Sequence, residues 1–316
     1  MNVVNNRIDF LFIKFPILFP LIYGILIYLF PDYQNYIILI TILILAEPHF
    51  AATWPFMINK SNRNMLNTKK IEFIFAPFLI FFLSIYFFFS FKEEFLLFFF
   101  IANVYHVTRQ STGICKLYST NFKETNYHVN LIYFYNIVLF FVGVFRFYLP
   151  IIKNEYILLT NIFLIGLLFL IVLFKIIKFG KGENLFTLLT GLLIFYPIAF
   201  VDNPVHAIIM GVTMHYSQYI ILTSVVVYRR QLPTESIIEK NTLKKYLIKF
   251  CLIIVIYSIF MTFFSSFEQS KNEILKQLIL IPILFQLLHF YFDGLLWRFS
   301  YKENRINTLQ HIFKKT

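Results

Sequence analysis

Four histidines lie within long apolar runs of this sequence, where an ionisable side chain is costly and is therefore a candidate for function. They are His49, His106, His215 and His289. Each lies near the middle or in the later half of its run, so at about 1.5 Å rise per residue the four could reach similar depth. Imidazole is a common metal ligand and suits iron, zinc and copper. We therefore predict a shared metal site; the alternatives are separate helix–helix hydrogen bonds or a proton or ion pathway.

Other polar side chains recur about one helical turn after these histidines: Gln110 after His106, Gln218 and Tyr219 after His215, and Asp293 after His289. Residues four apart share a helix face. Asp293 could therefore bind the metal or orient a neighbouring imidazole. Gln110, Gln218 and Arg109 are expected to support the ligands, although Arg109 could instead be a cytoplasmic anchor.

Glu47 precedes His49 by two residues, which places it roughly 200° around the helix unless Pro48 distorts the turn. We predict a role for it in or beside the site. Aromatic residues near the histidines could line a substrate slot: Phe50, Tyr105, Tyr216, Phe290 and Tyr291. Three further histidines are expected to lie outside the site, His206 on the opposite helix face and His128 and His311 at the surface.

Composition identifies the chain as an all-α polytopic integral membrane protein. Of its 316 residues, 59% are hydrophobic and only 14% are charged, whereas a soluble protein has about a quarter charged residues. The apolar residues form runs of the roughly 20 residues that cross a bilayer as a helix. Two cysteines exclude a disulfide framework and a thiolate metal site.

We predict a single transmembrane helical domain over residues 1–316. The first apolar run is expected to be a retained helix rather than a cleaved signal. The ten predicted crossing segments are residues 11–30, 36–56, 71–89, 95–112, 129–145, 156–174, 185–201, 205–227, 247–267 and 275–297.

The positive charges alternate between the two sides of the predicted bundle. Of the 28 Lys and Arg residues, only five fall on one side: Lys92, Arg146, Lys153, Lys271 and Lys276. The positive-inside rule then predicts that both termini are cytoplasmic, which requires an even number of crossings. Because this placement accounts for the net charge of +12, we predict contact with membrane lipid and none with nucleic acid.

The ordered set of Pro48-His49, His106, His215, and His289 with Asp293 resembles the Brp/Blh family, the bacterial and archaeal membrane β-carotene 15,15′-dioxygenases. Where that family has two histidines four residues apart, this chain has His215 and Tyr219. The resemblance implies a non-haem iron held by the four histidines and a multi-pass location in the bacterial cytoplasmic membrane.

We therefore expect an iron(II)- and O₂-dependent oxygenase acting on an apolar, lipid-dissolved substrate. A carotenoid-like isoprenoid cleaved to a retinal-like aldehyde is the specific expectation from the resemblance. Glu47, Tyr219 and Asp293 are the candidate catalytic residues beside the metal. The alternatives are a proton-coupled membrane transporter and a non-catalytic carotenoid- or quinone-binding protein.

Overall fold

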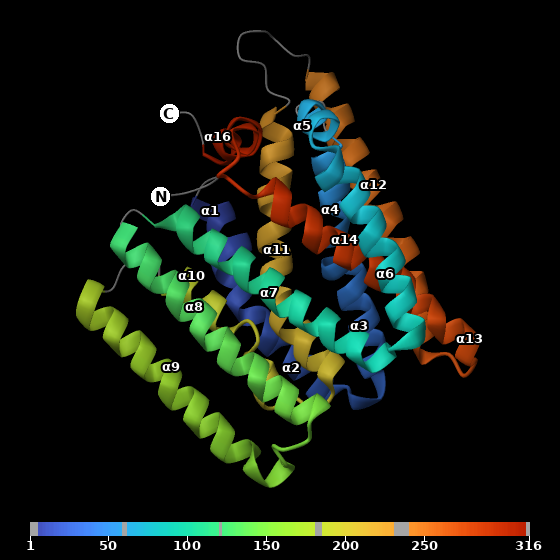
Figure 1. The fold of residues 1–316 in the computed structure, drawn as a ribbon. Helices are drawn as coiled ribbons and strands as arrows, with labels where there is room; N and C mark the ends of the chain where they lie inside the picture. Colours follow the sequence, from blue (N-terminus) through green and yellow to red (C-terminus); the bar gives the residue numbers. More distant parts are fainter. Residues whose placement is uncertain (1–5, 59–61, 120–121, 181–184, 231–239, 314–316) are drawn as a thin grey trace. The chain divides into compact units, whose positions relative to one another are not determined.

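The computed structural model describes residues 6–58, 62–119, 122–180, 185–230 and 240–313 (Figure 1). Within these ranges every regular element is a helix, as the composition predicts. The α-helices are α1 Asn6–Asp9, α2 Phe19–Leu29, α3 Gln34–Thr41, α4 Glu47–Met57, α5 Arg63–Thr68, α6 Ala76–Ser90, α7 Lys92–Tyr118, α8 Phe122–Gly143, α9 Ile157–Phe179, α10 Leu185–Leu193, α11 Pro204–Arg230, α12 Lys240–Ser266, α13 Glu273–Lys276, α14 Leu280–Leu296, α15 Lys302–Asn304 and α16 Gln310–Ile312.

Seven helical stretches in the described residues are long and apolar enough to cross a membrane. They are Arg7–Leu29, Pro31–Met57, Ile71–Ser90, Phe122–Tyr148, Ile157–Phe179, Ile248–Gln269 and Glu273–Leu296. Each overlaps one of the ten predicted segments, so a multi-pass membrane protein is confirmed. Helices α7 and α11 cover two more, with 27 residues each, but their polar residues make them less apolar. The total of ten crossings and the side of each terminus stay predictions.

The predicted segment 185–201 is not one continuous helix. Helix α10 has nine residues, about 14 Å at 1.5 Å per residue, or half a hydrocarbon core. It is followed by a 3₁₀ turn, η9 (Tyr196–Ala199), with Pro197 in its first positions. Proline lacks an N–H and crowds the preceding turn, so the α-helix ends before it. The apolar composition of this segment was therefore misleading about its backbone.

Side chains satisfy the carbonyl groups exposed by that interruption. Arg146 donates to the carbonyls of Ile198 and Val201, at 2.5 and 3.1 Å, and Asn161 donates to the carbonyl of Ala199 at 3.0 Å. Non-helical backbone at membrane depth is tolerated where protein groups supply the missing hydrogen bonds.

Four wider π-helical turns lie shortly before a proline. The π turns η1 (Phe10–Lys14), η4 (Ile42–Ala46), η6 (Ile71–Phe75) and η7 (Val144–Tyr148) each end two residues before a proline. Pro16, Pro48 and Pro77 lie within the helical stretch that continues after the π turn, where a proline ring crowds the carbonyl four residues earlier, whereas Pro150 follows the end of its helix. The π turn before Pro48 lies directly ahead of the Glu47–His49 segment of α4.

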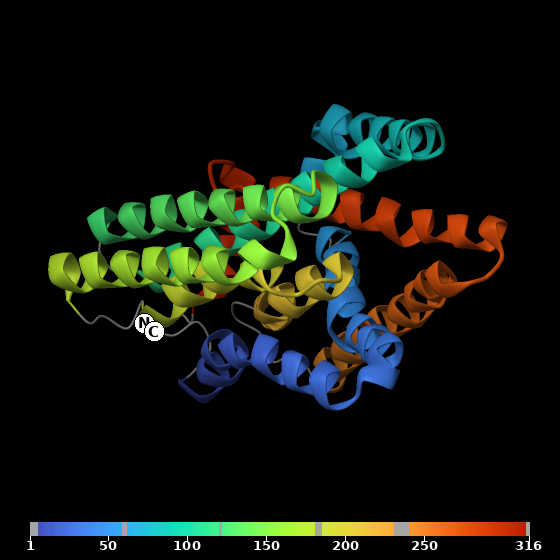
Figure 2. The ribbon, with the colours of Figure 1, turned by 90° about the horizontal axis from the view of Figure 1, so that it is seen from below.

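The chain forms two compact units. One comprises residues 1–34 and 103–218, and the other comprises residues 35–102 and 219–316. In the first unit α8 and α9 lie side by side in Figures 1 and 2, and Tyr135 on α8 donates a hydrogen bond to the carbonyl of Leu164 on α9. α10 packs on α8, where Asn136 donates to the carbonyl of Gly191 at 3.0 Å.

In the second unit α4 packs against α12 and α14, and α14 also packs against α6. An apolar cluster from α6, α7 and α14 fixes these contacts: Phe88, Phe95, Leu280, Ile283, Leu284 and Leu287. This packing determines which faces of α4 and α14 meet, and therefore positions His49 and His289.

Candidate metal centre

In the second unit, His49 on α4 and His289 on α14 meet in the protein interior. Their side chains are 1% and 0% exposed, and their ring centroids lie 4.6 Å apart in an edge-to-face arrangement. Tyr219, on the part of α11 that belongs to this unit, packs on both rings, with centroid distances of 4.4 Å to His49 and 5.6 Å to His289. The structure thus brings together two predicted ligands and the predicted catalytic tyrosine.

Asp293 completes this group from α14. Its Oδ1 accepts hydrogen bonds from the Tyr219 hydroxyl at 2.5 Å and from the Thr53 hydroxyl at 3.1 Å. Its Oδ2 lies 3.8 Å from Nε2 of His289. The Thr53 hydroxyl is also hydrogen-bonded to Nδ1 of His289 at 2.7 Å and to the Tyr219 hydroxyl at 2.8 Å. These partners hold one side of the imidazole and one oxygen of the carboxylate in fixed directions.

The separation between His289 Nε2 and Asp293 Oδ2 suits a shared cation. A distance of 3.8 Å is too long for a direct hydrogen bond. Nitrogen and oxygen ligands of a metal such as zinc lie about 2.0–2.2 Å from the ion, so two ligands of one ion can be up to about 4 Å apart. The donor types and their spacing therefore fit a metal ion.

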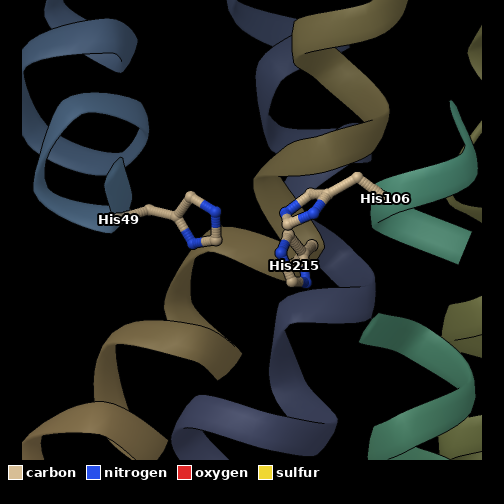
Figure 3. Close-up of side chains that lie close together, drawn as sticks. All are labelled: His49, His106 and His215. Carbon is tan, nitrogen blue, oxygen red and sulfur yellow. The ribbon is translucent and has the colours of Figure 1, made fainter. Parts of the chain in front are cut away.

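In the first unit, His106 on α7 and His215 on α11 form a second pair. Their ring centroids lie 6.3 Å apart at an interplanar angle of 84°, and their side chains are 5% and 1% exposed. Figure 3 shows these two side chains close together, His106 from α7 and His215 from α11, and it also labels His49 on α4. All four predicted histidines are buried and belong to groups of donors that could hold a metal ion.

The predicted supporting residues have mixed outcomes. Gln218 does not turn toward His215, because its Nε2 donates to the carbonyl of Ile13 at 2.8 Å. That carbonyl belongs to the π turn before Pro16, so Gln218 stabilises the first helix rather than an imidazole. Gln110 and Arg109 are partly buried on α7. Their predicted role beside His106 stays a prediction.

Glu47 is 1% exposed. Its carboxyl group faces Gln286 on α14 and Tyr257 on α12. This placement agrees with the predicted angular offset from His49. Glu47 therefore lies beside polar residues of α12 and α14 in the same unit as His49.

The predicted aromatic slot is only partly assembled within the second unit. Phe50 packs on His49 and His289 with centroid distances of 5.1 and 5.0 Å, and Phe290 lies 6.4 Å from Phe50. Tyr291 points elsewhere, because its hydroxyl donates to the carbonyl of Glu72 at 2.8 Å.

The two tyrosines of the first unit differ from each other. Tyr216 is 6% exposed and its ring lies 6.3 Å from that of His215, whereas Tyr105 is 59% exposed. Tyr105 lies on the same exposed face of α7 as Phe98 and Ile101, so the prediction that it lines a slot is not supported by its position. The sequence could not reveal this, because neighbouring helix positions differ in direction by about 100°.

The remaining histidines have structural partners. His206 is buried and its Nδ1 is hydrogen-bonded to the Tyr23 hydroxyl at 2.7 Å. His128 is 1% exposed and lies 3.6 Å from Glu124, so the expectation of a surface position was wrong. Glu124 also pairs with the fully buried Lys175 at 3.4 Å, so both His128 and Lys175 have the same carboxylate as a partner. His311 is partly exposed near the C-terminus.

Sequence reasoning missed Thr53 and Trp297. Thr53 is fully buried and contacts three members of the group, and Trp297 packs on Tyr219 with a centroid distance of 5.9 Å. The signal for Thr53 was its position four residues after His49, which places both on one helix face.

No family model matches the sequence, and no similar curated protein or solved structure is found. The function is therefore argued from the site alone.

Proposed function

We propose that this protein is a membrane-embedded, iron(II)- and O₂-dependent oxygenase acting on an apolar substrate dissolved in the lipid. The observation that carries the proposal is the pair of His289 Nε2 and Asp293 Oδ2, which lie 3.8 Å apart. The other polar atom of each side chain, Nδ1 or Oδ1, is fixed by a hydrogen bond.

The donor set favours iron over other common metals. His289 and Asp293 supply an imidazole and a carboxylate from a single unit, and the imidazole of His49 packs beside that of His289. Two imidazoles and one carboxylate are the donor types that non-haem iron(II) oxygenases use with coordination positions left open. Iron(II), when bound, supplies electrons for the activation of O₂. A site made only of nitrogen and oxygen donors is also consistent with two cysteines that take no part.

His106 and His215 are further ligands in this proposal. α11 is one continuous helix, and it carries His215 and Tyr219 four residues apart, hence on one face. The predicted four-histidine site rests on this spacing together with the similar depth expected from the sequence. Loss of metal on substitution of His106 or His215 would support it.

The protein's own residues have three tasks in the proposed reaction. Thr53 and Tyr219 orient the imidazole of His289 and the carboxylate of Asp293. Phe50 and Phe290 provide an apolar wall that excludes water and contacts a hydrocarbon chain. The lipid-facing helices allow such a substrate to enter laterally from the bilayer.

The substrate class follows from the membrane location and from the resemblance of the histidine pattern to the β-carotene dioxygenases. We propose a carotenoid-like isoprenoid, cleaved at a double bond to aldehydes such as retinal. Both oxygen atoms of O₂ would end in the two aldehyde products, so the cleavage balances without an added reductant.

The direct test is to supply β-carotene to the purified, iron-loaded protein in liposomes and to analyse the products by chromatography. We expect retinal from the wild-type protein and from the His311→Ala control, but none from His289→Ala. Iron-loaded, folded wild-type protein that neither consumes O₂ nor releases aldehydes from carotenoids would contradict this substrate. An unmodified pigment retained by the protein would favour the non-catalytic binding role.

A proton-coupled transporter is the second candidate, and the interrupted segment of α10 and η9 favours it. Transporters often bind their substrate where a helix is broken. Here, however, the side chains of Arg146 and Asn161 already bind the carbonyls of the break. Substrate flux that depends on pH in liposomes, with substoichiometric metal, would favour transport over oxygenation.

A further inference from the structure

Thr53 occupies the centre of the buried group in the second unit. Its hydroxyl lies within hydrogen-bonding distance of three polar atoms, His289 Nδ1 at 2.7 Å, Tyr219 Oη at 2.8 Å and Asp293 Oδ1 at 3.1 Å. The side chain is 0% exposed. A hydroxyl has one proton to donate and two lone pairs to accept with, so these neighbours restrict how the protons can be arranged.

The direction of each hydrogen bond can be derived from the carboxylate outward. The Tyr219 hydroxyl donates its one proton to Asp293 Oδ1, 2.5 Å away, and so has no proton left for Thr53. The Thr53 proton must then fill the contact with Tyr219 or with Asp293, because otherwise oxygen lone pairs would face each other there. Either choice leaves the Thr53 oxygen as an acceptor toward His289.

We infer that Thr53 is a positioning residue that fixes the tautomer of His289, with the proton on Nδ1 and the lone pair on Nε2. His289 Nδ1 then donates to Thr53, and the hydroxyl protons of Thr53 and Tyr219 point into the part of the group around Asp293 Oδ1. Linked hydrogen bonds of this kind polarise and strengthen one another. This inference rests on the proposed metal site only for its purpose, because the proton arrangement is a property of the metal-free protein.

The consequence for ligand binding is specific. The lone pair is then on Nε2, the nitrogen that lies 3.8 Å from Asp293 Oδ2, so two electron-pair donors lie within the span of one metal ion. A histidine whose other nitrogen donates to a fixed partner is the usual arrangement of a metal-binding imidazole. Thr53 therefore prepares His289 for a metal before the metal arrives.

The test compares Thr53→Val, which removes the hydroxyl at nearly constant shape, with Thr53→Ser, which retains it. The first readout is the nitrogen NMR spectrum of ¹⁵N-histidine-labelled, metal-free protein, in which His289 is assigned by the signal lost in His289→Gln. We expect the Nδ1–H tautomer in the wild type and in Thr53→Ser, and a loss of that preference in Thr53→Val. Thr53→Ala provides a second hydroxyl-free variant should the valine variant not fold.

The second readout is the affinity for zinc(II), measured by competition with a chelator. Removing an outer hydrogen-bond partner of a metal-binding histidine typically lowers affinity about 10–100-fold. We expect a loss of that size in Thr53→Val and an affinity close to wild type in Thr53→Ser.

The two readouts separate this inference from the proposed function. A Thr53→Val protein that keeps the Nδ1–H tautomer, or a Thr53→Ser protein that loses it equally, would overturn the role of Thr53. A tautomer that responds as expected in a wild-type protein that binds no metal would support Thr53 and contradict the metal centre.

Discussion

At the scale of single residues, Asp293 divides its two oxygens between two tasks. Oδ1 accepts from Tyr219 and Thr53, and Oδ2 faces His289 Nε2. A buried carboxylate is costly unless it is hydrogen-bonded and paired with a positive charge. Two hydroxyl donors satisfy part of this requirement, and a metal ion between Oδ2 and Nε2 would supply the charge. The proposed metal site therefore depends most on the charge of Asp293.

Asp293→Asn tests that charge at nearly constant shape. We expect the variant to fold but to bind metal at least about 10-fold more weakly, because an amide oxygen is a poorer ligand and an NH₂ group cannot replace it. The measurement is a zinc(II) or iron(II) titration in detergent. Asp32→Asn, a change at an exposed position, serves as the control and should leave the affinity unchanged. Equal affinities for the two variants would remove Asp293 from the site.

The histidines could be predicted from the sequence because an ionisable residue stands out in an apolar run, whatever its tertiary neighbours are. Thr53 did not stand out in this way, since a threonine in a membrane helix commonly bonds to its own backbone, and its spacing of four residues from His49 indicates only a shared helix face. The direction of Gln218 was equally hidden, because it depends on the carbonyl of Ile13, about two hundred residues away in the chain. Sequence periodicity indicates which residues share a face of a helix. Which residues that face contacts depends on how the helices pack.

At the scale of elements, the break between α10 and η9 depends on a close approach by α11. A Cβ atom placed on Gly211 would lie 1.8 Å from the carbonyl oxygen of Ile194, at the end of α10. Only glycine permits this contact. Pro197 and Gly211 can both be seen in the sequence, but their closeness in space cannot. For the same reason the segment was predicted as a full crossing helix.

Gly211→Ala should therefore destabilise the protein. We expect a loss of about 1–3 kcal/mol, typical of overpacking, seen as a lower thermal unfolding temperature in detergent. Gly113→Ala is the matched control, because a Cβ there meets nothing within 4 Å. Alanine in that helix should be neutral or stabilise by about 0.5–1 kcal/mol. Similar unfolding temperatures for the two variants would contradict the close approach.

At the scale of the whole molecule, the apolar lengths indicate the spans, and the distribution of positive charge predicts the orientation in the membrane. Seven stretches are confirmed as candidate spans, and α7 and α11 are long enough to cross as well. Of 28 basic residues, only five fall on the predicted outer side. This imbalance predicts cytoplasmic termini, a matter that helix geometry alone does not decide.

Reporter fusions test this orientation. We expect a cytoplasm-active reporter to function at both the N- and the C-terminus, and a fusion in the loop at Lys153 to report the opposite side. The reason is the excess of Lys and Arg in the alternate loops. Termini found on opposite sides would mean an odd number of crossings. One of three segments would then not span the membrane: α7, α11, or the interrupted segment of α10 and η9.

The central claim is that the buried histidines and Asp293 hold one metal ion. It is tested most directly by elemental mass spectrometry of the detergent-purified protein, produced under low oxygen with iron supplied. We predict close to one iron per chain in the wild type and in His311→Ala, and a loss of iron in His49→Ala and His289→Ala. A folded, monodisperse wild-type protein with no metal above background would contradict the metal centre, and the histidines would then be better explained as a proton or ligand pathway.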